Sequence, residues 1–479
     1  TTFFIMGFFV YTVTRSLKRE LSAPKLNVAA TIVMVVGLVA AAVPILLNLA
    51  TVLFTFYPPM KASPYFYLGL ALVIVGSWMH GWGFFLTYRD WRKENPKEKT
   101  PLIAFGSIVT MAMWQIATLG VAIEVLVMLI PFAFGLTSGT DPQLARTFFW
   151  FFGHPVVYFW LLPVYVAWYG MVPKQAGGKL FSDSLARIVF WMFLVLIPTG
   201  IHHQYTDPGV PSGWKVVHAV LTFSIFFPSL ITAFTVIASL EVGGRARGGK
   251  GLFGWIRSLP WDDPSYTAHN LAMILFAFGG ISGITNASYN LNTTVHNTIW
   301  VPGHFHLTVG SAVTLSFFGI IYWMLPSLIN KPLWSRKLAL WQCWTWFTGM
   351  ILMSNGLHIL GLNFGAPRRS ALGTAPYVGA DWQPLMIEAA IGGIILGISG
   401  LLFYINIVGT AVSKERLAEP IEMPVAEPLN GNEVQNLPAW IDSWRPWLIA
   451  TAALILIAYV PVFVTLISQY NPVPGFKVW

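Results

Sequence analysis

The chain has 479 residues, of which 56% are hydrophobic and only 10% are charged, and it contains a single cysteine. A soluble domain of this size cannot cover so much apolar surface, and one cysteine excludes both an internal disulfide framework and a thiolate metal cluster. The net charge of +9 comes from short basic segments between long apolar runs. That pattern indicates membrane topology and argues against nucleic-acid binding.

Apolar runs follow one another along the chain, so the sequence predicts an all-α membrane helix bundle in a single domain over residues 1–479. About 11 full spans are expected, at 27–56, 65–88, 102–135, 145–171, 185–204, 214–241, 266–291, 298–326, 338–364, 380–411 and 444–469. The opening TTFFIMGFFVYTV is too short to span, and we interpret it as the end of a helix. The start of that helix, with one further helix before it, is expected to be missing. Strongly basic loops alternate with loops that hold few basic residues, so the chain is expected to end outside.

The stretch TVHNTIWVPGHFHLTV (Thr294–Val309) carries His304 and His306 at the start of a long apolar run. Two positions along an α-helix differ by roughly 200° of rotation, so the two imidazoles are expected on opposite sides. Ionisable residues inside a membrane are commonly functional, and one helix is therefore predicted to offer a metal ligand to each of two neighbours. The alternative is two unrelated polar residues, one of which faces a cavity.

Three further histidines are candidates for a second metal site. His154 lies in the core of one span, and His202 and His203 end the next span, shortly after Pro198. A proline loosens the helix, which lets successive side chains converge. Three imidazoles with one open position suit copper and a small ligand, although zinc also accepts three histidines.

Two spans carry hydroxyl groups in line. The first places three tyrosines with His154 within a stripe of roughly 60°: Tyr158, Tyr165 and Tyr169. The second carries hydroxyls spaced three apart: Ser229, Thr232 and Thr235. These groups are predicted to relay protons together with water. The alternatives are tyrosines that bond neighbouring helices and hydroxyls that bond the carbonyl one turn back.

On the outer side, His296 precedes the His304–His306 helix, and Arg368 and Arg369 stand in a loop with few other basic residues. A guanidinium pair suits carboxylates, and heme propionates are the expected partners. An outer-surface anion or a structural salt bridge is the alternative. Four histidines lack a partner at ligand spacing and are expected in the core or at interfaces, with the last near the cytoplasmic surface: His80, His218, His358 and His269.

In order and spacing, three motifs resemble the catalytic subunit (subunit I) of heme-copper oxidases: GHPVVY (Gly153–Tyr158), the pair His202–His203, and HFH (His304–His306). The segments KQAGGKL, GLFGWIRSLPWD, VHNTIWVPGHFHL and NPVPGFKVW are similar to the B family, which contains the ba-type cytochrome c oxidases. The resemblance covers the whole chain, apart from the family's first helix and the start of its second.

The resemblance implies three cofactors: a low-spin heme, a high-spin heme and one copper ion. The copper ligands would be His154, His202 and His203. His304 would bind the high-spin heme iron and His306 the low-spin heme iron, whose second ligand would lie upstream of Thr1. Tyr158 would be linked covalently to His154 and would be catalytic. Cofactor contacts would come from His296, Arg368, Arg369 and Trp300, and the proton path from Tyr165, Tyr169, Ser229, Thr232 and Thr235.

The predicted function is that of a terminal oxidase catalytic subunit, which reduces dioxygen to water with electrons from cytochrome c and pumps protons. The expected partners are a subunit II whose copper site takes up electrons, cytochrome c, and the lipid bilayer of a prokaryotic plasma membrane, without nucleic acid. Asn292 stands where a close relative has Asp, and Val156 where the A family often has Glu.

Three other functions remain open from the sequence. Within the superfamily, the alternatives are a nitric oxide reductase and a quinol-oxidising enzyme, and Tyr158 argues against the first because that family lacks this tyrosine. The alternative from a different class is a proton-coupled secondary transporter with buried histidines. A transporter would need neither the HFH pair nor a heme, so a visible spectrum separates the two classes.

Overall fold

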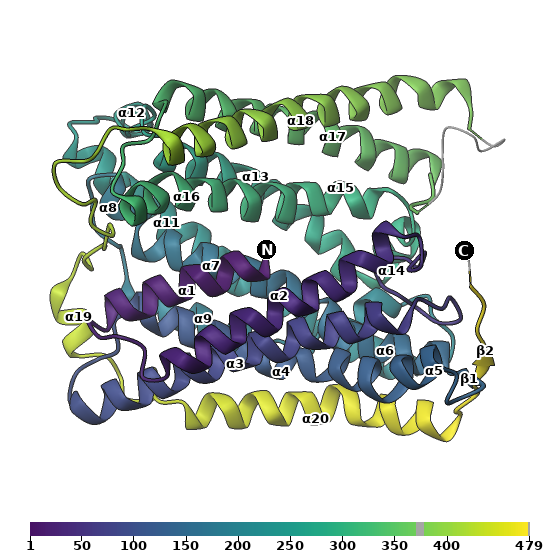
Figure 1. Cartoon of the computed structure of the whole chain (residues 1–479). Coiled ribbons are helices and arrows are strands. Elements are labelled where there is room, and N and C mark those ends of the chain that lie inside the picture. Colours follow the sequence, from purple (N-terminus) through teal and green to yellow (C-terminus); the bar gives the residue numbers. More distant parts are fainter. Residues whose placement is uncertain (370–377, 478–479) are drawn as a thin grey trace. The chain divides into compact units, whose positions relative to one another are not determined.

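The computed structural model describes residues 1–369 and 378–477, and this part of the chain is predominantly helical (Figure 1). The last two residues of NPVPGFKVW lie outside it. Two compact units can be distinguished. Unit 1 comprises Thr1–Pro163, Phe190–Ile225 and Pro438–Trp479, and unit 2 comprises Val164–Val189 and Phe226–Leu437. The predicted all-α membrane fold is confirmed.

Unit 1 holds the first helices of the chain and the last one. Its elements are α1 (Thr2–Ser16), α2 (Pro24–Leu46), α3 (Pro64–Glu94), α4 (Leu102–Ile123), the π-helix η1 (Glu124–Leu129), α5 (Ile130–Phe134), α6 (Pro142–Gly153), the 3-10 helix η2 (Gly200–Gln204), α10 (Ser212–Ser224) and α20 (Arg445–Ser468). A short antiparallel pair joins β1 (Gly139–Thr140) to β2 (Val473–Pro474). The boundary between the units falls inside α7 (Pro155–Gly170) and α9 (Asp183–Val195).

Unit 2 holds the helices that carry His304 and His306 and those that pack on them. Its elements are α8 (Val172–Gln175), α11 (Phe226–Ala246), α12 (Gly254–Arg257), α13 (Pro264–Ala287), α14 (Tyr289–Val295), α15 (Trp300–Leu307), the π-helix η3 (Thr308–Val313), α16 (Thr314–Ile329), α17 (Arg336–Phe364), the 3-10 helix η5 (Ala380–Trp382), α18 (Gln383–Val412) and α19 (Gly431–Gln435). A π-helical turn often marks a functional site, and η3 begins two residues after His306.

Nine segments of the described chain are long and apolar enough to cross a membrane, and together they make a multi-pass protein. These nine segments are fewer than the roughly 11 spans that the sequence predicts. α9 has only 13 residues, too few to span the bilayer, and α17, with 29, is not among the nine. The span predicted at 185–204 ends at Val195, because Pro198 lacks the amide donor that a continuing helix needs.

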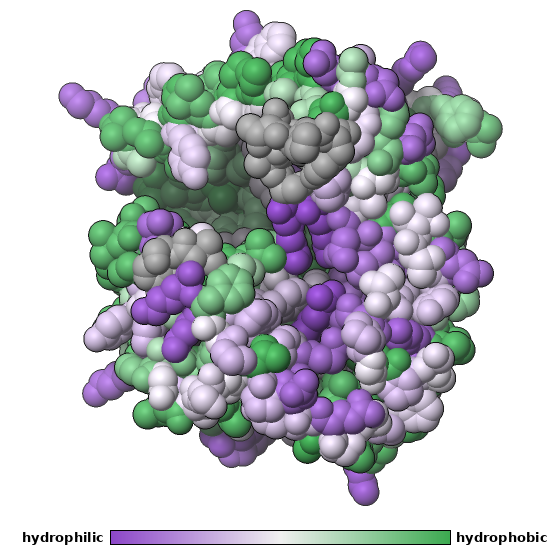
Figure 2. All heavy atoms as spheres, turned by 90° about the vertical axis from the view of Figure 1, so that its right-hand side faces the viewer, coloured by the Kyte–Doolittle hydropathy of each residue, from purple (hydrophilic) through white to green (hydrophobic). Residues whose placement is uncertain are grey.

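The surface pattern agrees with a membrane location. Large apolar side chains on α2, among them Ile32 and Val36, are more than half exposed, as expected for a helix that faces lipid. Figure 2 looks onto the end where the connections between helices lie, and there hydrophilic residues gather while hydrophobic residues occupy much of the rim. The predicted alternation of apolar spans and polar connections is therefore present in three dimensions.

The packing of α2 on α3 depends on small residues. A Cβ atom at Gly69 would lie 2.4 Å from the amide nitrogen of Ala41, and one at Gly37 would lie 2.7 Å from the carbonyl oxygen of Gly69. Close approach through glycine is a common means of associating helices in membranes, where no hydrophobic effect drives them together. The two helices therefore touch backbone to backbone at this point.

Gly69→Ala is expected to lower the thermal stability of the purified protein, at a cost of about 1–3 kcal/mol for overpacking. The added methyl group meets the backbone of α2, which cannot move aside as a flexible side chain would. Gly7→Ala on α1 is the matched control, because no atom lies within 4 Å of its added Cβ. A thermal melt in detergent decides the matter, and equal melting temperatures for the two variants would contradict this account of the packing.

Candidate metal and heme-ligand sites

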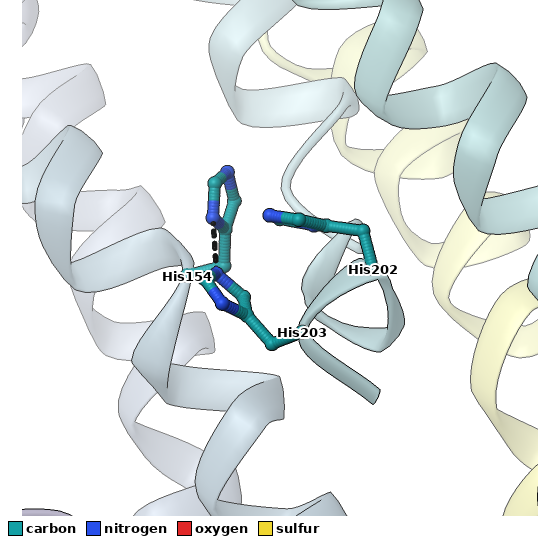
Figure 3. Close-up of side chains that lie close together, drawn as sticks. All are labelled: His154, His202 and His203. Atoms are coloured by element: carbon teal, nitrogen blue, oxygen red, sulfur yellow. Dashed lines mark hydrogen bonds between the residues drawn. The ribbon is translucent and has the colours of Figure 1, made fainter. Parts of the chain in front are cut away.

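Three histidines of unit 1 come together as the sequence predicts. One ring nitrogen from each of His154, His202 and His203 lies within 4.8 Å of the others (Figure 3). Among the described residues, this is the group of His, Cys, Asp or Glu side chains that could hold a metal ion. His154 Nδ1 is 2.9 Å from His203 Nε2, so in the absence of a metal the two nitrogens share one proton. A metal ion replaces that proton when it binds.

The local sequence explains how these histidines reach one another. His154 lies at the junction between α6 and α7, where Pro155 begins the second helix. His202 and His203 belong to the short helix η2, whose Gly200 admits no side chain, because a Cβ there would lie 1.9 Å from the carbonyl oxygen of Trp150. This glycine lets η2 approach α6 closely enough for the three imidazoles to converge.

Two of the neighbours that hold η2 in place are aromatic and were not predicted from the sequence. The Trp150 ring stacks on His203, with centroids 3.8 Å apart and planes 9° apart. The Tyr459 hydroxyl accepts a hydrogen bond from the Gly200 amide at 3.0 Å. The spacing offered one signal, since Trp150 precedes His154 by one helical turn, whereas Tyr459 is remote in sequence.

The hydrogen bonds leave the ring nitrogens of this cluster suited to a metal. His202 Nδ1–H donates to the Thr199 carbonyl at 2.6 Å, so its Nε2 keeps a lone pair. His154 Nε2 lies 2.5 Å from the Tyr158 hydroxyl one turn along, which leaves Nδ1 for the cluster. Three neutral imidazoles form a donor set that fits copper.

In unit 2 the histidines of the HFH motif contact different helices. His304 lies beside α13, where the Ser282 hydroxyl donates to the Gly279 carbonyl at 2.8 Å and accepts from His304 Nδ1–H at 2.8 Å. The His306 ring lies beside Gly310, whose missing side chain admits Met350 of α17. His304 therefore faces α13, and His306 lies on the side of α17.

The tautomer of each of these histidines follows from its partner. His306 Nδ1–H donates to the Pro302 carbonyl at 2.7 Å, because a carbonyl oxygen only accepts. His304 Nδ1–H is likewise engaged by Ser282. In both rings Nε2 is left with a lone pair, the arrangement in which an imidazole binds a heme iron. The residues of the motif therefore fit two irons.

The predicted outer residues lie on two segments of unit 2, 296–300 and 368–369, which are joined by hydrogen bonds. His296 Nδ1–H donates to the Asn292 side-chain oxygen at 3.1 Å. The Arg368 backbone and side chain both donate to Asn297, at 2.9 Å and 3.2 Å, which ties the Arg368–Arg369 loop to the start of the ligand helix. Trp300, which is buried, lies parallel to His304 at 6.3 Å between ring centroids.

Of the predicted hydroxyl groups of unit 2, those of Tyr165, Tyr169, Thr232 and Thr235 belong to buried residues, and Ser229 is partly buried. The Tyr169 hydroxyl donates to Thr232 Oγ1 at 2.6 Å, and Thr232 in turn donates to the Pro228 carbonyl at 2.7 Å. Tyr165 interacts with the hydroxyls of Thr232 and Ser229. Thr235 Oγ1 is fully buried with no hydrogen-bond partner in the described part of the chain, so it has capacity for a water molecule.

The remaining histidines differ in their surroundings. His80 is engaged by Asn27 at 2.9 Å and Thr31 at 3.2 Å, and His218 by the Ala458 carbonyl at 3.0 Å, as expected for core histidines. His269, which the sequence predicts near the cytoplasmic surface, lies close to the start of α13 and is completely buried against Gly319 of α16.

The comparisons with known proteins agree with this fold. A family model described as "Cytochrome C and Quinol oxidase polypeptide I" matches residues 1–395. The chain is 46% identical to "Cytochrome c oxidase subunit 1" of Thermus thermophilus over 449 residues, which cover 93% of this chain and 80% of the relative. It is 28% identical to the protein of that name in a Synechocystis species, with 76% of this chain and 64% of the relative covered.

A solved structure extends the agreement to three dimensions. The structure of a heme-copper terminal oxidase dimer, obtained by cryo-EM, matches with a TM-score of 0.94 and 37% sequence identity, and covers 100% of this chain and 85% of that one. The fold and the histidine sites together define a heme-copper terminal oxidase.

The chain belongs to the cytochrome c and quinol oxidase polypeptide I family, the catalytic subunits of these enzymes. It is thus a multi-pass membrane enzyme whose cofactors are two hemes and one copper, and its bacterial relatives indicate the plasma membrane. This family assignment removes the transporter alternative.

Proposed function

We propose that His154, His202 and His203 hold the copper ion and that His304 and His306 hold the high-spin and low-spin heme irons. The observation that carries the proposal is the cluster of three ring nitrogens within 4.8 Å in unit 1. Unit 2 contributes the two proposed heme ligands. We propose that residues 1–479 form a single catalytic domain. When bound, the metals accept electrons and bind dioxygen, while the protein residues supply position and protons.

Arg368 and Arg369 would neutralise the propionate carboxylates of the hemes, and His296 and Trp300 would be further cofactor contacts. The hydrogen bonds from Arg368 to Asn297 support this assignment, because they fix the arginine loop to the segment that leads into the ligand helix. A guanidinium forms stronger and more directional hydrogen bonds with a carboxylate than an ammonium does.

Tyr158 acts at the copper site as a source of a proton and an electron. Its hydroxyl is 2.5 Å from His154 Nε2, close enough for the covalent link that the family resemblance implies. Forming a nitrogen–carbon bond between the two rings removes one hydrogen from each, and dioxygen accepts these two hydrogens. Peptide mass spectrometry tests the link, because the joined peptides are lighter by two hydrogens than their sum.

Protons for the reaction enter along the hydroxyl groups of unit 2: Tyr165, Tyr169, Ser229, Thr232 and Thr235. The bond from Tyr169 to Thr232 supports the route. Thr232 donates to the Pro228 carbonyl, so a passing proton requires its hydroxyl to rotate away from that carbonyl and back. Hydroxyl groups with water carry a proton without holding a charge in the membrane, which would be costly.

We further propose that the electron donor is cytochrome c, acting through a copper site on subunit II, and that turnover pumps protons. The donor assignment rests on the 46% identical relative named a cytochrome c oxidase. A Staphylococcus haemolyticus relative named a probable quinol oxidase is 25% identical, and 53% of its length is covered. Oxygen consumption by the purified complex with reduced cytochrome c or with a quinol decides between the two donors.

The proposed metal assignment is tested by a reduced-minus-oxidised visible spectrum together with metal analysis. The expected result is one low-spin heme signal, one high-spin heme signal that responds to carbon monoxide, and copper. Two heme signals without copper would instead favour the nitric oxide reductase alternative, whose second metal is iron.

His304→Ala is expected to abolish carbon monoxide binding at the high-spin heme while it spares most of the low-spin spectrum. The reason is that His304 and His306 contact different helices, so the loss of one imidazole leaves the other in place. His306→Ala is the reciprocal variant and should remove the low-spin signal. Loss of both signals in either variant alone, in a protein that still folds, would refute the division of roles.

A further inference from the structure

Ser354 and His358 of α17 contact Gly303 of the ligand helix α15. Gly303 lies between His304, the first heme ligand, and Pro302, whose carbonyl bonds the second heme ligand, His306. The Ser354 hydroxyl donates to the Gly303 carbonyl at 2.7 Å, and the contact is buried. His358 occupies the place that a side chain on Gly303 would take, because a Cβ there would lie 2.7 Å from His358 Nδ1. No other residue type at position 303 admits this ring.

His358 is itself held in one orientation. Its Nδ1–H donates to the Ser354 carbonyl at 2.8 Å and lies 3.1 Å from the Ser354 hydroxyl. Its ring stands edge to face with Trp300, with centroids 4.9 Å apart and planes 88° apart. The two helices also meet through Gly361, where a Cβ would lie 2.2 Å from the Trp300 amide nitrogen. One turn of α17 therefore packs closely against one turn of α15.

We propose that Ser354 and His358 are positioning residues for the heme ligands and act through the backbone of Gly303. Gly303 lies between Pro302 and His304, and the Pro302 carbonyl accepts a hydrogen bond from His306 Nδ1–H. Fixing Gly303 fixes the plane of the Pro302 carbonyl and hence the strength of its hydrogen bond to His306. That bond raises the basicity of the imidazole and favours the oxidised iron.

The inference rests on the proposed function, in which His306 ligates the low-spin heme. The surroundings of His358 Nε2 indicate that this ring does more than fill space. Because Nδ1 carries the ring proton, Nε2 bears a buried lone pair that has no hydrogen-bond partner among the described residues. A phenyl ring would fill the same space without that polar cost. The imidazole is explained by the hydrogen bond that Nδ1 makes.

The test measures the low-spin heme in the purified, fully loaded enzyme by EPR and by redox titration. Ser354→Ala removes the bond to Gly303, and His358→Phe removes the bond to Ser354 while it keeps a ring beside Trp300. Each should shift the low-spin EPR g values and raise the ratio of reduced to oxidised low-spin heme at a fixed potential by about fivefold, the scale of one hydrogen bond. Copper content and high-spin heme content should stay the same.

Two conservative variants and one control separate positioning from general loosening. Ser354→Thr keeps the hydroxyl and His358→Asn keeps a donor near the Nδ1 position, so both should restore most of the wild-type spectrum. Thr345→Val on the same helix removes a hydroxyl that bonds only to α17 carbonyls and should have no effect. If His358→Phe does not assemble, Ser354→Ala decides the question.

Unchanged g values and an unchanged potential in a fully loaded Ser354→Ala enzyme would overturn the inference while leaving the proposed function intact. A wild-type enzyme with no low-spin heme signal would instead refute the proposed function itself. The two failures are therefore distinguishable in the same set of spectra.

Discussion

Replacing His202 with alanine is expected to remove copper from the enzyme, with both hemes retained, and to reduce dioxygen consumption to background. Among the described residues three imidazoles converge in this cluster, so the loss of one leaves two protein ligands and weakens the hold on the ion. Loss of an outer-shell partner typically costs 10- to 100-fold in metal affinity, and loss of a direct ligand should cost more than about 100-fold. The measurement is copper and iron content per protein, with turnover on the same sample.

His218→Ala is the matched control for this variant. His218 is another buried histidine of unit 1, on α10, and it bonds the Ala458 carbonyl and not the cluster. Its loss should cost stability but leave copper bound. Alanine variants of His154 and His203 should behave like His202→Ala, and full copper retention in all three would refute the site.

Tyr169→Phe and Thr232→Val are each expected to slow turnover by about tenfold or more without loss of metals, the scale of a lost proton-transfer partner. The two hydroxyls are in direct contact at 2.6 Å, and both are buried, so water cannot readily replace either one. On the proposed route a proton passes from Tyr169 to Thr232. Removing either hydroxyl therefore interrupts the same step. Together the two changes should cost little more than either alone, since both interrupt one path.

The control for the tyrosine variant is Tyr266→Phe, a change at another fully buried tyrosine of unit 2 that lies on α13, outside the proposed route. It should leave the turnover rate close to that of the wild type. Rapid measurement of proton uptake on the reduced enzyme separates slow proton transfer from slow electron transfer. Wild-type turnover in both Tyr169→Phe and Thr232→Val would require a different path for protons.

The sequence alone predicted most of the membrane fold and the identities of the candidate ligands. Apolar runs are a strong signal because a membrane helix must satisfy all of its backbone hydrogen bonds internally over a fixed length. The two-residue separation of His304 and His306 predicted different directions for the two rings, since helical rotation is a local property. The sequence placed span ends less well, as at Val195, because proline and loop geometry decide them.

Only the tertiary structure determined which neighbours orient those ligands. Trp150 stacks on His203, and Ser282 bonds His304. Ser354 and His358 contact Gly303. None of the contacting residues Trp150, Ser282, Ser354 and His358 belongs to a distinctive motif. Each contact joins two different helices, and it depends on where two surfaces approach closely. The ligand residues, and tautomers set within one turn such as that of His306 by Pro302, are therefore determined by local chemistry. The contacts of Trp150, Ser282 and Ser354 arise only when the helices pack.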